Sequence, residues 1–126
     1  MGQVIRVEGY AAVFDAPDRA GDVMRSGAFA GVGQVPLLVQ HRGGAVGRIE
    51  AIGEDARGLR LTAVVADAGV ARLVSAGALP GLSVGYRARV VRRGAWREIL
   101  RADLAEVSLV AVPMQPAARV ERVSAA

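Results

Sequence analysis

Three residue types are missing from this chain of 126 residues, which contains no cysteine, no lysine and no asparagine. It also has a single histidine, His41. The absence of cysteine excludes disulfide bridges and thiolate metal sites, and one histidine argues against a histidine-rich metal site. We therefore expect neither a metal nor another cofactor.

Aromatic residues are scarce, at 4% of the chain, which leaves little material for stacking against bases. All sixteen basic residues are arginine, and the net charge is +4. Six of them gather in one stretch, namely Arg87, Arg89, Arg92, Arg93, Arg97 and Arg101. This stretch is interpreted either as a solvated edge hairpin or as a docking surface. Nucleic-acid binding is the weaker interpretation because aromatic residues are so few.

Long apolar runs are missing too, so no membrane-spanning segment is predicted. Residues 1–8 alternate apolar and polar groups, a pattern that does not indicate a signal peptide. The length and the 52% hydrophobic content fit one globular domain. We expect a single domain over residues 1–120 and a flexible tail over residues 121–126.

Two-residue alternation dominates the chain and is typical of β-strands. Strands are predicted over 3–14, 35–41, 46–52, 59–66, 82–92, 95–101 and 104–112, with a hairpin turn at 54–58. One helix is predicted over 68–76, capped by Asp67 and stopped by Gly77, and Ser26 offers a marginal cap for a helical turn. The pattern predicts a mainly β protein with one or two short helices, folded as a small antiparallel β-barrel or sandwich.

Ser83 lies in the segment Gly81–Tyr86, on the opposite side of its strand from the apolar residues. A catalytic serine needs an imidazole to accept its proton, and His41 is the one imidazole available. Serines in strands are more often structural, so this pattern alone leaves the role of Ser83 open. Gly81 and Gly85 match the spacing of a Gly-x-Ser-x-Gly elbow, but here a helix precedes the serine and a strand follows, which excludes an α/β-hydrolase.

Glu106 and Ser108 share one side of the last predicted strand. A carboxylate among so many apolar neighbours needs a partner, which is either an arginine or His41. Asp103 and Asp22 are weaker candidates for an acid that orients the histidine. Ser108 either supports Glu106 or fills the strand, and the second interpretation is favoured because hydroxyls suit β positions.

The order of His41, the Gly81–Tyr86 segment and the stretch 104–110 resembles the prohead serine proteases of tailed phages, relatives of the herpesvirus assemblins. Residues 9–14, 26–29 and 35–38 are similar to further segments of that family. The resemblance implies the assemblin-like fold, with Ser83 as nucleophile, His41 as general base and Glu106 as the third member. Assemblins instead use a second histidine there. Assemblins also use an arginine-containing loop for the oxyanion, whereas this chain has Pro113–Pro116, so the backbone amides of Met114 and Gln115 are the candidates.

The resemblance further implies an endopeptidase that cleaves the scaffold segment of the major capsid protein precursor, and itself, during maturation. It would act inside the prohead in the host bacterial cytoplasm, for a phage, a prophage or a gene-transfer agent. A homodimer is compatible by analogy, and no membrane partner is expected. Two alternatives stay open, namely a non-catalytic capsid-assembly module with the same fold and a basic β-barrel that binds nucleic acid.

Overall fold

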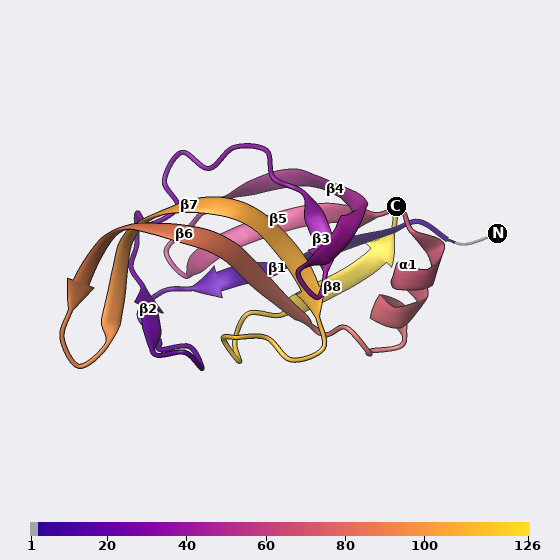
Figure 1. Cartoon of the computed structure of the whole chain (residues 1–126). Helices are drawn as coiled ribbons and strands as arrows, with labels where there is room; N and C mark the ends of the chain where they lie inside the picture. Colours follow the sequence, from indigo (N-terminus) through magenta and orange to yellow (C-terminus); the bar gives the residue numbers. More distant parts are fainter. Residues whose placement is uncertain (1–2) are drawn as a thin grey trace.

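The computed structural model describes residues 3–126, which form eight strands and one helix. Figure 1 shows the strands curving around one another, with a long hairpin projecting from one end. In chain order the elements are β1 (Ile5–Val13), β2 (Asp22–Met24), β3 (Leu37–Val39), β4 (Arg42–Glu54), β5 (Gly58–Val65), α1 (Ala68–Ser75), β6 (Gly81–Arg93), β7 (Arg97–Val110) and β8 (Val120–Ala125).

One sheet contains all eight strands, in the order β2-β7-β3-β4-β5-β1-β8, with β6 on β7. Two of its strands, β2 and β3, run parallel to β7. The remaining pairings of the sheet are antiparallel. The sheet curls back on itself where the Leu82 amide donates to the Ala118 carbonyl, at 2.9 Å. The mainly β fold with one short helix is confirmed for residues 3–126, and the expected antiparallel sheet is corrected to a mixed one.

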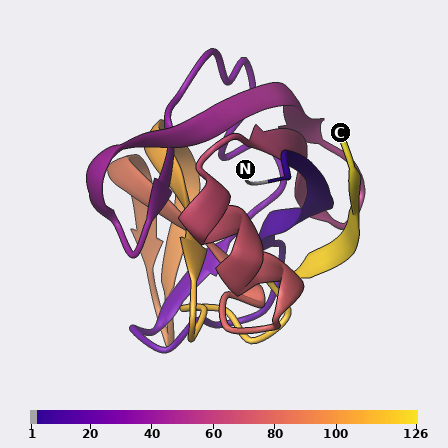
Figure 2. The ribbon, with the colours of Figure 1, turned by 90° about the vertical axis from the view of Figure 1, so that its right-hand side faces the viewer.

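The hydrophobic core lies inside the curled sheet. Its fully buried members come from strands that are distant in sequence, including Val7, Leu37, Leu61, Leu82 and Leu109. Figure 2 shows α1 lying in front of the sheet when the molecule is viewed from one end. The helix contributes Ala71 and Val74 to the buried set, so it helps to close that end.

Local chemistry explains the helix and the central hairpin, both of which were predicted. The Asp67 Oδ1 atom accepts from the Val70 amide at 3.0 Å, and Gly77 takes the left-handed backbone conformation after the last turn, with φ +80°. Between β4 and β5, Asp55 Oδ1 accepts from the amides of Arg57 and Gly58, at 2.8 and 3.1 Å.

Within residues 3–126, no helix has the length and apolar character needed to cross a membrane.

Several expectations about elements are wrong. Residues 95–101 and 104–112 were predicted as separate strands but belong to one strand, β7. The β6–β7 pairing contains register shifts near Ala88 and Val90, which change the phase of the alternation and make one strand look like two. The region 26–30 forms turns rather than a helix, because Gly27 and Gly31 both have positive φ.

The C-terminal segment is the third correction. Residues 121–126 were expected as a flexible tail, yet β8 pairs with β1 along Ile5–Gly9. Its residues are mostly exposed, and two valines among small and charged residues are too weak a local sign to predict a strand. The pairing itself holds the segment, since backbone hydrogen bonding to β1 needs no apolar side chain.

Candidate active site

The long β6–β7 hairpin brings the predicted serine and acid to one face. Ser83 lies opposite Ser108, and Gly85 lies opposite Glu106. Residues directly opposite each other in a strand pair project from the same side of the sheet, as do residues two apart along a strand. Ser83, Glu106 and Ser108 therefore share a face.

His41 reaches this face from a two-residue turn between β3 and β4. Val39 pairs with Arg42 across the turn, and both residues between them have positive φ, at 53° for Gln40 and 60° for His41. That backbone is the one found in type I′ hairpin turns. The strand predicted through His41 thus ends at Val39. Because β3 runs parallel to β7, with Leu38 opposite Ser108, the turn lies beside Glu106 and Ser108.

Glu106 makes two hydrogen bonds with different functional partners. Its Oε1 atom contacts His41 Nδ1, and its Oε2 atom accepts from the Ser108 hydroxyl at 2.7 Å. The Ser108 oxygen in turn accepts from the His41 amide at 3.0 Å. The partner of Glu106 is therefore the histidine rather than an arginine, and Ser108 supports the acid instead of merely filling the strand.

The other acids considered from the sequence are engaged elsewhere. Asp103 pairs with Arg89 on the projecting hairpin, and Asp22 forms a two-point ion pair with Arg97. Among the three candidates, Glu106 is the one in contact with His41.

A carboxylate at Nδ1 has a chemical consequence for the imidazole. It favours a proton on Nδ1, so a neutral ring keeps the Nε2 lone pair free. The His41 side chain is 44% exposed and Glu106 only 13%, so the acid is sheltered while the ring meets solvent. The pair can accept a proton at Nε2 and stabilise the imidazolium that results.

Ser83 and His41 line the same pocket, of about 470 Å³. Its remaining walls are Gln40, Arg42, Val110, Val112 and Met114. Ser83 is 6% exposed, and no hydrogen bond joins its hydroxyl to His41 or to another residue of the described range. No buried side-chain polar atom within residues 3–126 lacks a partner, so the Ser83 hydroxyl must be reached by solvent. The structure brings His41 and Glu106 into contact and leaves Ser83 nearby without a bond to the ring.

The two glycines beside Ser83 make room for neighbours. A Cβ atom on Gly85 would lie 2.3 Å from Glu106 Oε1, and one on Gly81 would lie 2.7 Å from the Pro113 ring. Both distances are shorter than any real Cβ contact. Both glycines therefore allow a packed neighbour to approach the backbone closely, and one of the neighbours is the acid itself.

The loop after β7 carries the two candidate oxyanion donors. Met114 lines the pocket, and neither its amide nor that of Gln115 donates to an acceptor within residues 3–126. The Gln115 side chain is buried and exchanges two hydrogen bonds with the Val13 backbone, both at 2.8 Å. That anchor, which the sequence did not reveal, fixes the loop against β1. The oxyanion role of the two amides stays a prediction.

The sequence matches the family model of the Caudovirus prohead serine protease over residues 2–126. The chain belongs to this family. No curated protein sequence matches it.

Solved structures of herpesvirus proteases resemble this member of the prohead protease family in fold. The protease of varicella-zoster virus is 18% identical, with a TM-score of 0.63 over 97% of this chain. The KSHV protease in complex with a hexapeptide phosphonate inhibitor is 17% identical, with a TM-score of 0.61 over 90% of it. The matches cover 64% and 62% of those proteases, so the chain spans less than two thirds of their length. At this identity the likeness shows the fold.

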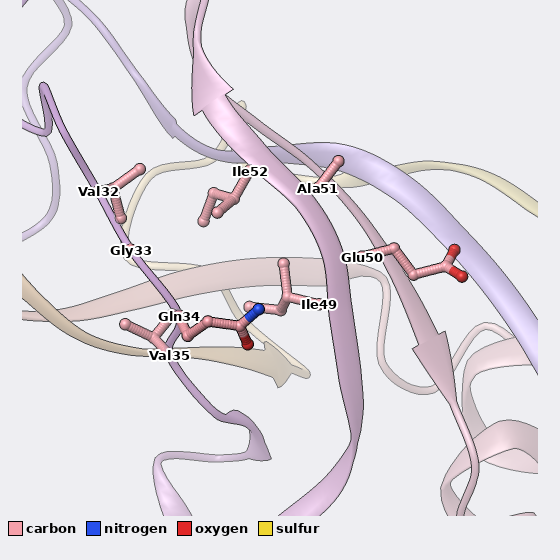
Figure 3. Close-up of a pocket in the computed structure, with 8 residues that line it drawn as sticks. All are labelled: Val32, Gly33, Gln34, Val35, Ile49, Glu50, Ala51 and Ile52. Carbon is pink, nitrogen blue, oxygen red and sulfur yellow. The ribbon is translucent and has the colours of Figure 1, made fainter.

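A second hollow of this family member, of about 350 Å³, is lined by residues 32–35 and 49–52. Figure 3 shows its apolar side chains, among them Ile49 and Ile52, with the Glu50 carboxylate pointing away from the 32–35 segment. Glu50 is paired with Arg6 and Arg48, and the lining holds no nucleophile or imidazole. This hollow therefore lacks the groups for acyl transfer.

Within residues 3–126, no three His, Cys, Asp or Glu side chains cluster in a way that could hold a metal ion.

A polar group of three side chains links β2, β6 and β7. The Tyr86 hydroxyl bonds to Asp22, whose carboxylate also receives two hydrogen bonds from Arg97, both at 2.8 Å. Arg97 lowers the pKa of Asp22, while burial, together with the Asp22 charge, raises the pKa of the Tyr86 phenol. Tyr86 therefore stays neutral at physiological pH and acts here as a structural hydrogen-bond donor.

Proposed function

We propose that this chain is a serine endopeptidase that uses Ser83, His41 and Glu106, and that its substrate is the scaffold segment of a capsid protein precursor. The contact between His41 Nδ1 and Glu106 is the observation that carries the proposal. That contact leaves Nε2 free beside a pocket that Ser83 also lines. The family membership supports the same reaction class.

The proposed reaction divides into two acyl-transfer steps. The Ser83 oxygen attacks the scissile carbonyl carbon while His41 Nε2 takes the hydroxyl proton, and Glu106 stabilises the imidazolium. The C–N bond then breaks as His41 returns that proton to the leaving amine, which gives an ester on Ser83. Water, deprotonated by His41, hydrolyses the ester and restores the serine.

Catalysis requires the Ser83 hydroxyl to approach Nε2 more closely than in the unbound chain. Catalytic hydrogen bonds are often long without substrate and tighten when it binds. The amides of Met114 and Gln115 are the proposed oxyanion donors, and losing one such donor would lower turnover by about 10²–10³-fold.

The proposed partner is an acidic stretch of the capsid precursor, bound by the projecting hairpin inside the immature shell. Residues 87–103 contain six arginines and two carboxylates, while the rest of the chain contains ten of each. The net charge of +4 is therefore the excess of this hairpin alone. Arg87 and Arg93 have no ion-pair partner within residues 3–126, so they are available to carboxylates of another chain.

Co-expression with the capsid precursor tests the protease directly. We expect the wild type to release a defined N-terminal fragment of the precursor, seen by intact mass, and Ser83→Ala to release none. Ser26→Ala is the matched control, because Ser26 lies in a turn outside the pocket, and should cleave normally.

The other outcomes are equally informative. Equal cleavage by wild type and Ser83→Ala would remove Ser83 as nucleophile. If neither the wild type nor Ser83→Ala cleaved the precursor inside assembled shells, the result would favour a non-catalytic assembly module. The lack of a Ser83–His41 hydrogen bond is also consistent with that alternative.

A further inference from the structure

The turn that carries His41 has an unfavourable backbone. Gln40 and His41 are consecutive non-glycine residues with positive φ, at 53° and 60°. Such a turn normally holds glycine or asparagine, and side chains larger than these adopt it only when their surroundings fix it. Something in the fold must therefore hold this turn in place.

Three hydrogen bonds hold the turn against β7 and the residue that follows it. Gln40 is fixed by backbone, since its amide donates to the Leu109 carbonyl at 3.0 Å, and its side-chain oxygen accepts from the Ala111 amide at 2.9 Å. His41 is fixed by a side chain, because its amide donates to Ser108 Oγ at 3.0 Å. Ser108 thus determines how the backbone of the histidine lies on β7.

The same hydroxyl also orients the acid. Ser108 donates its proton to Glu106 Oε2 at 2.7 Å, while Oε1 of that carboxylate contacts the His41 ring. A hydroxyl has one donor and two acceptor sites, so it can serve both groups at once. Ser108 is completely buried, and water cannot take over either bond without a rearrangement.

We propose that Ser108 is a positioning residue. It fixes the backbone of His41 and, at the same time, the Glu106 carboxylate that holds the His41 ring. This inference rests on the proposed function and extends it to a fourth residue. Ser108 acts only through His41 and Glu106, because it does not line the pocket that Ser83 shares with His41.

Losing the hydroxyl leaves two polar groups without partners, the His41 amide and Glu106 Oε2. The turn then keeps its backbone strain but loses the bond at its second residue. We expect the imidazole to sample orientations other than the one that Glu106 holds, which lowers turnover rather than substrate binding. A serine that merely filled the strand would affect only stability.

The kinetic test compares Ser108→Ala with Ser108→Thr, which keeps the hydroxyl, and with Ser124→Ala, the same change on exposed β8. Cleavage of a peptide from the mapped precursor site is measured. We expect Ser108→Ala to lower kcat roughly 10- to 100-fold with KM nearly unchanged. Ser108→Thr should recover at least part of the loss, and Ser124→Ala should match the wild type.

A second measurement does not depend on catalysis. The chain has one histidine, so the imidazole N–H proton in a ¹H–¹⁵N spectrum belongs to His41 without assignment. We expect a protected Nδ1–H signal in the wild type, in Ser83→Ala and in Ser108→Thr, and its loss in Ser108→Ala. If Ser108→Ala does not fold, Ser108→Cys, which retains the volume with a weaker donor, takes its place and should weaken the signal.

The outcomes separate the two proposals. An inactive wild type that shows the protected signal, together with its loss in Ser108→Ala, would refute the protease but support the positioning role. Wild-type kcat and an intact imidazole signal in a folded Ser108→Ala protein would overturn that role, even if Ser83 proves to be the nucleophile.

Discussion

Gly85 controls where the acid of the proposed triad can lie. Its missing side chain leaves the space that the Glu106 carboxylate occupies on the neighbouring strand. A glycine in a strand interior normally weakens the strand, so its presence here is accounted for by this close approach. The side chain of residue 85 therefore decides whether Glu106 can reach His41.

Gly85→Ala should displace the carboxylate and reduce cleavage at least about 10²-fold, because an added Cβ would meet Glu106 Oε1 at 2.3 Å. All the atoms that the new Cβ would meet belong to the Glu106 side chain and none to the backbone, so we expect the effect on activity to exceed the effect on stability, which urea unfolding measures. Gly53→Ala is the control, since Gly53 also lies in a strand and its added Cβ would meet nothing within 4 Å. Full activity of Gly85→Ala would show that Glu106 need not occupy its present position.

Glu106→Gln should lower kcat by up to about 10⁴-fold while leaving the fold intact. An amide in place of the carboxylate cannot stabilise the imidazolium and can stabilise the wrong tautomer of His41. Asp103→Asn is the matched control, because Asp103 pairs with Arg89 on the surface and both side chains are more than half exposed. Steady-state cleavage assays would contradict this assignment if the two variants were equally active.

Among the elements, short β2 depends on ion pairs with β7. Arg97 on β7 holds Asp22 of β2, and Glu98 receives hydrogen bonds from Arg92 and from Arg25, just after β2. The two arginines lower the pKa of Glu98 to about 2. Folding thus stabilises the ionised form of Glu98 relative to its protonated form.

The contribution of Glu98 to stability should consequently depend on pH. Its folded pKa lies below the ordinary value of about 4.3, so the contribution is complete above that pH and is lost as the pH falls toward 2. We expect the Tm difference between wild type and Glu98→Gln to be constant from pH 7 to 5 and to shrink between pH 4.5 and 2. Calorimetry at each pH would contradict this if the difference did not change.

Elements with local chemistry could be predicted from the sequence, and elements formed by pairing could not. Asp67 and Gly77 mark the ends of α1 within a few residues, and Asp55 does the same for the β4–β5 turn. β8 has no comparable signal, because exposed residues such as Ser124 become a strand only through β1. The parallel contacts of β2 and β3 with β7 likewise depend on long-range packing.

The candidate site divides in the same way. His41, Ser83 and Glu106 were identified from residue type, strand face and family resemblance, and the contact between His41 and Glu106 agrees with that choice. Ser108 was undervalued because a strand serine is ordinary in itself. Its role depends on the turn at His41, whose Gln–His sequence is not typical of two consecutive positive φ values.

At the scale of the whole molecule, the excess of positive charge lies outside the pocket, although one arginine, Arg42, is part of the pocket wall. The excess of arginine lies on the β6–β7 hairpin, which projects beyond the rest of the sheet (Figure 1). An extended arm of this kind can attract an acidic segment without occupying the site where the chain would be cut.

Replacing Arg87 and Arg93 by glutamine should weaken binding of an acidic peptide at least about fivefold at low salt, with a smaller effect at 0.5 M salt. Fluorescence anisotropy with a glutamate-rich peptide and a neutral peptide of equal length measures this. The Arg48→Gln/Arg72→Gln variant changes the charge equally, at positions outside the hairpin, and should bind nearly as well as the wild type. Equal losses in both double variants would mean that net charge, rather than the hairpin, attracts the peptide.

The parallel pairing of β3 with β7 also determines when the site can exist. His41 and Ser108 are 67 positions apart, and their contact requires both strands to be in place. Since synthesis proceeds from the N-terminus, a growing chain carries its histidine long before the acid and the serine beside it have emerged. A nascent chain that stops short of Glu106 therefore cannot form the His41–Glu106 pair, and the proposed proteolysis has to wait until the two strands have been synthesised and have paired.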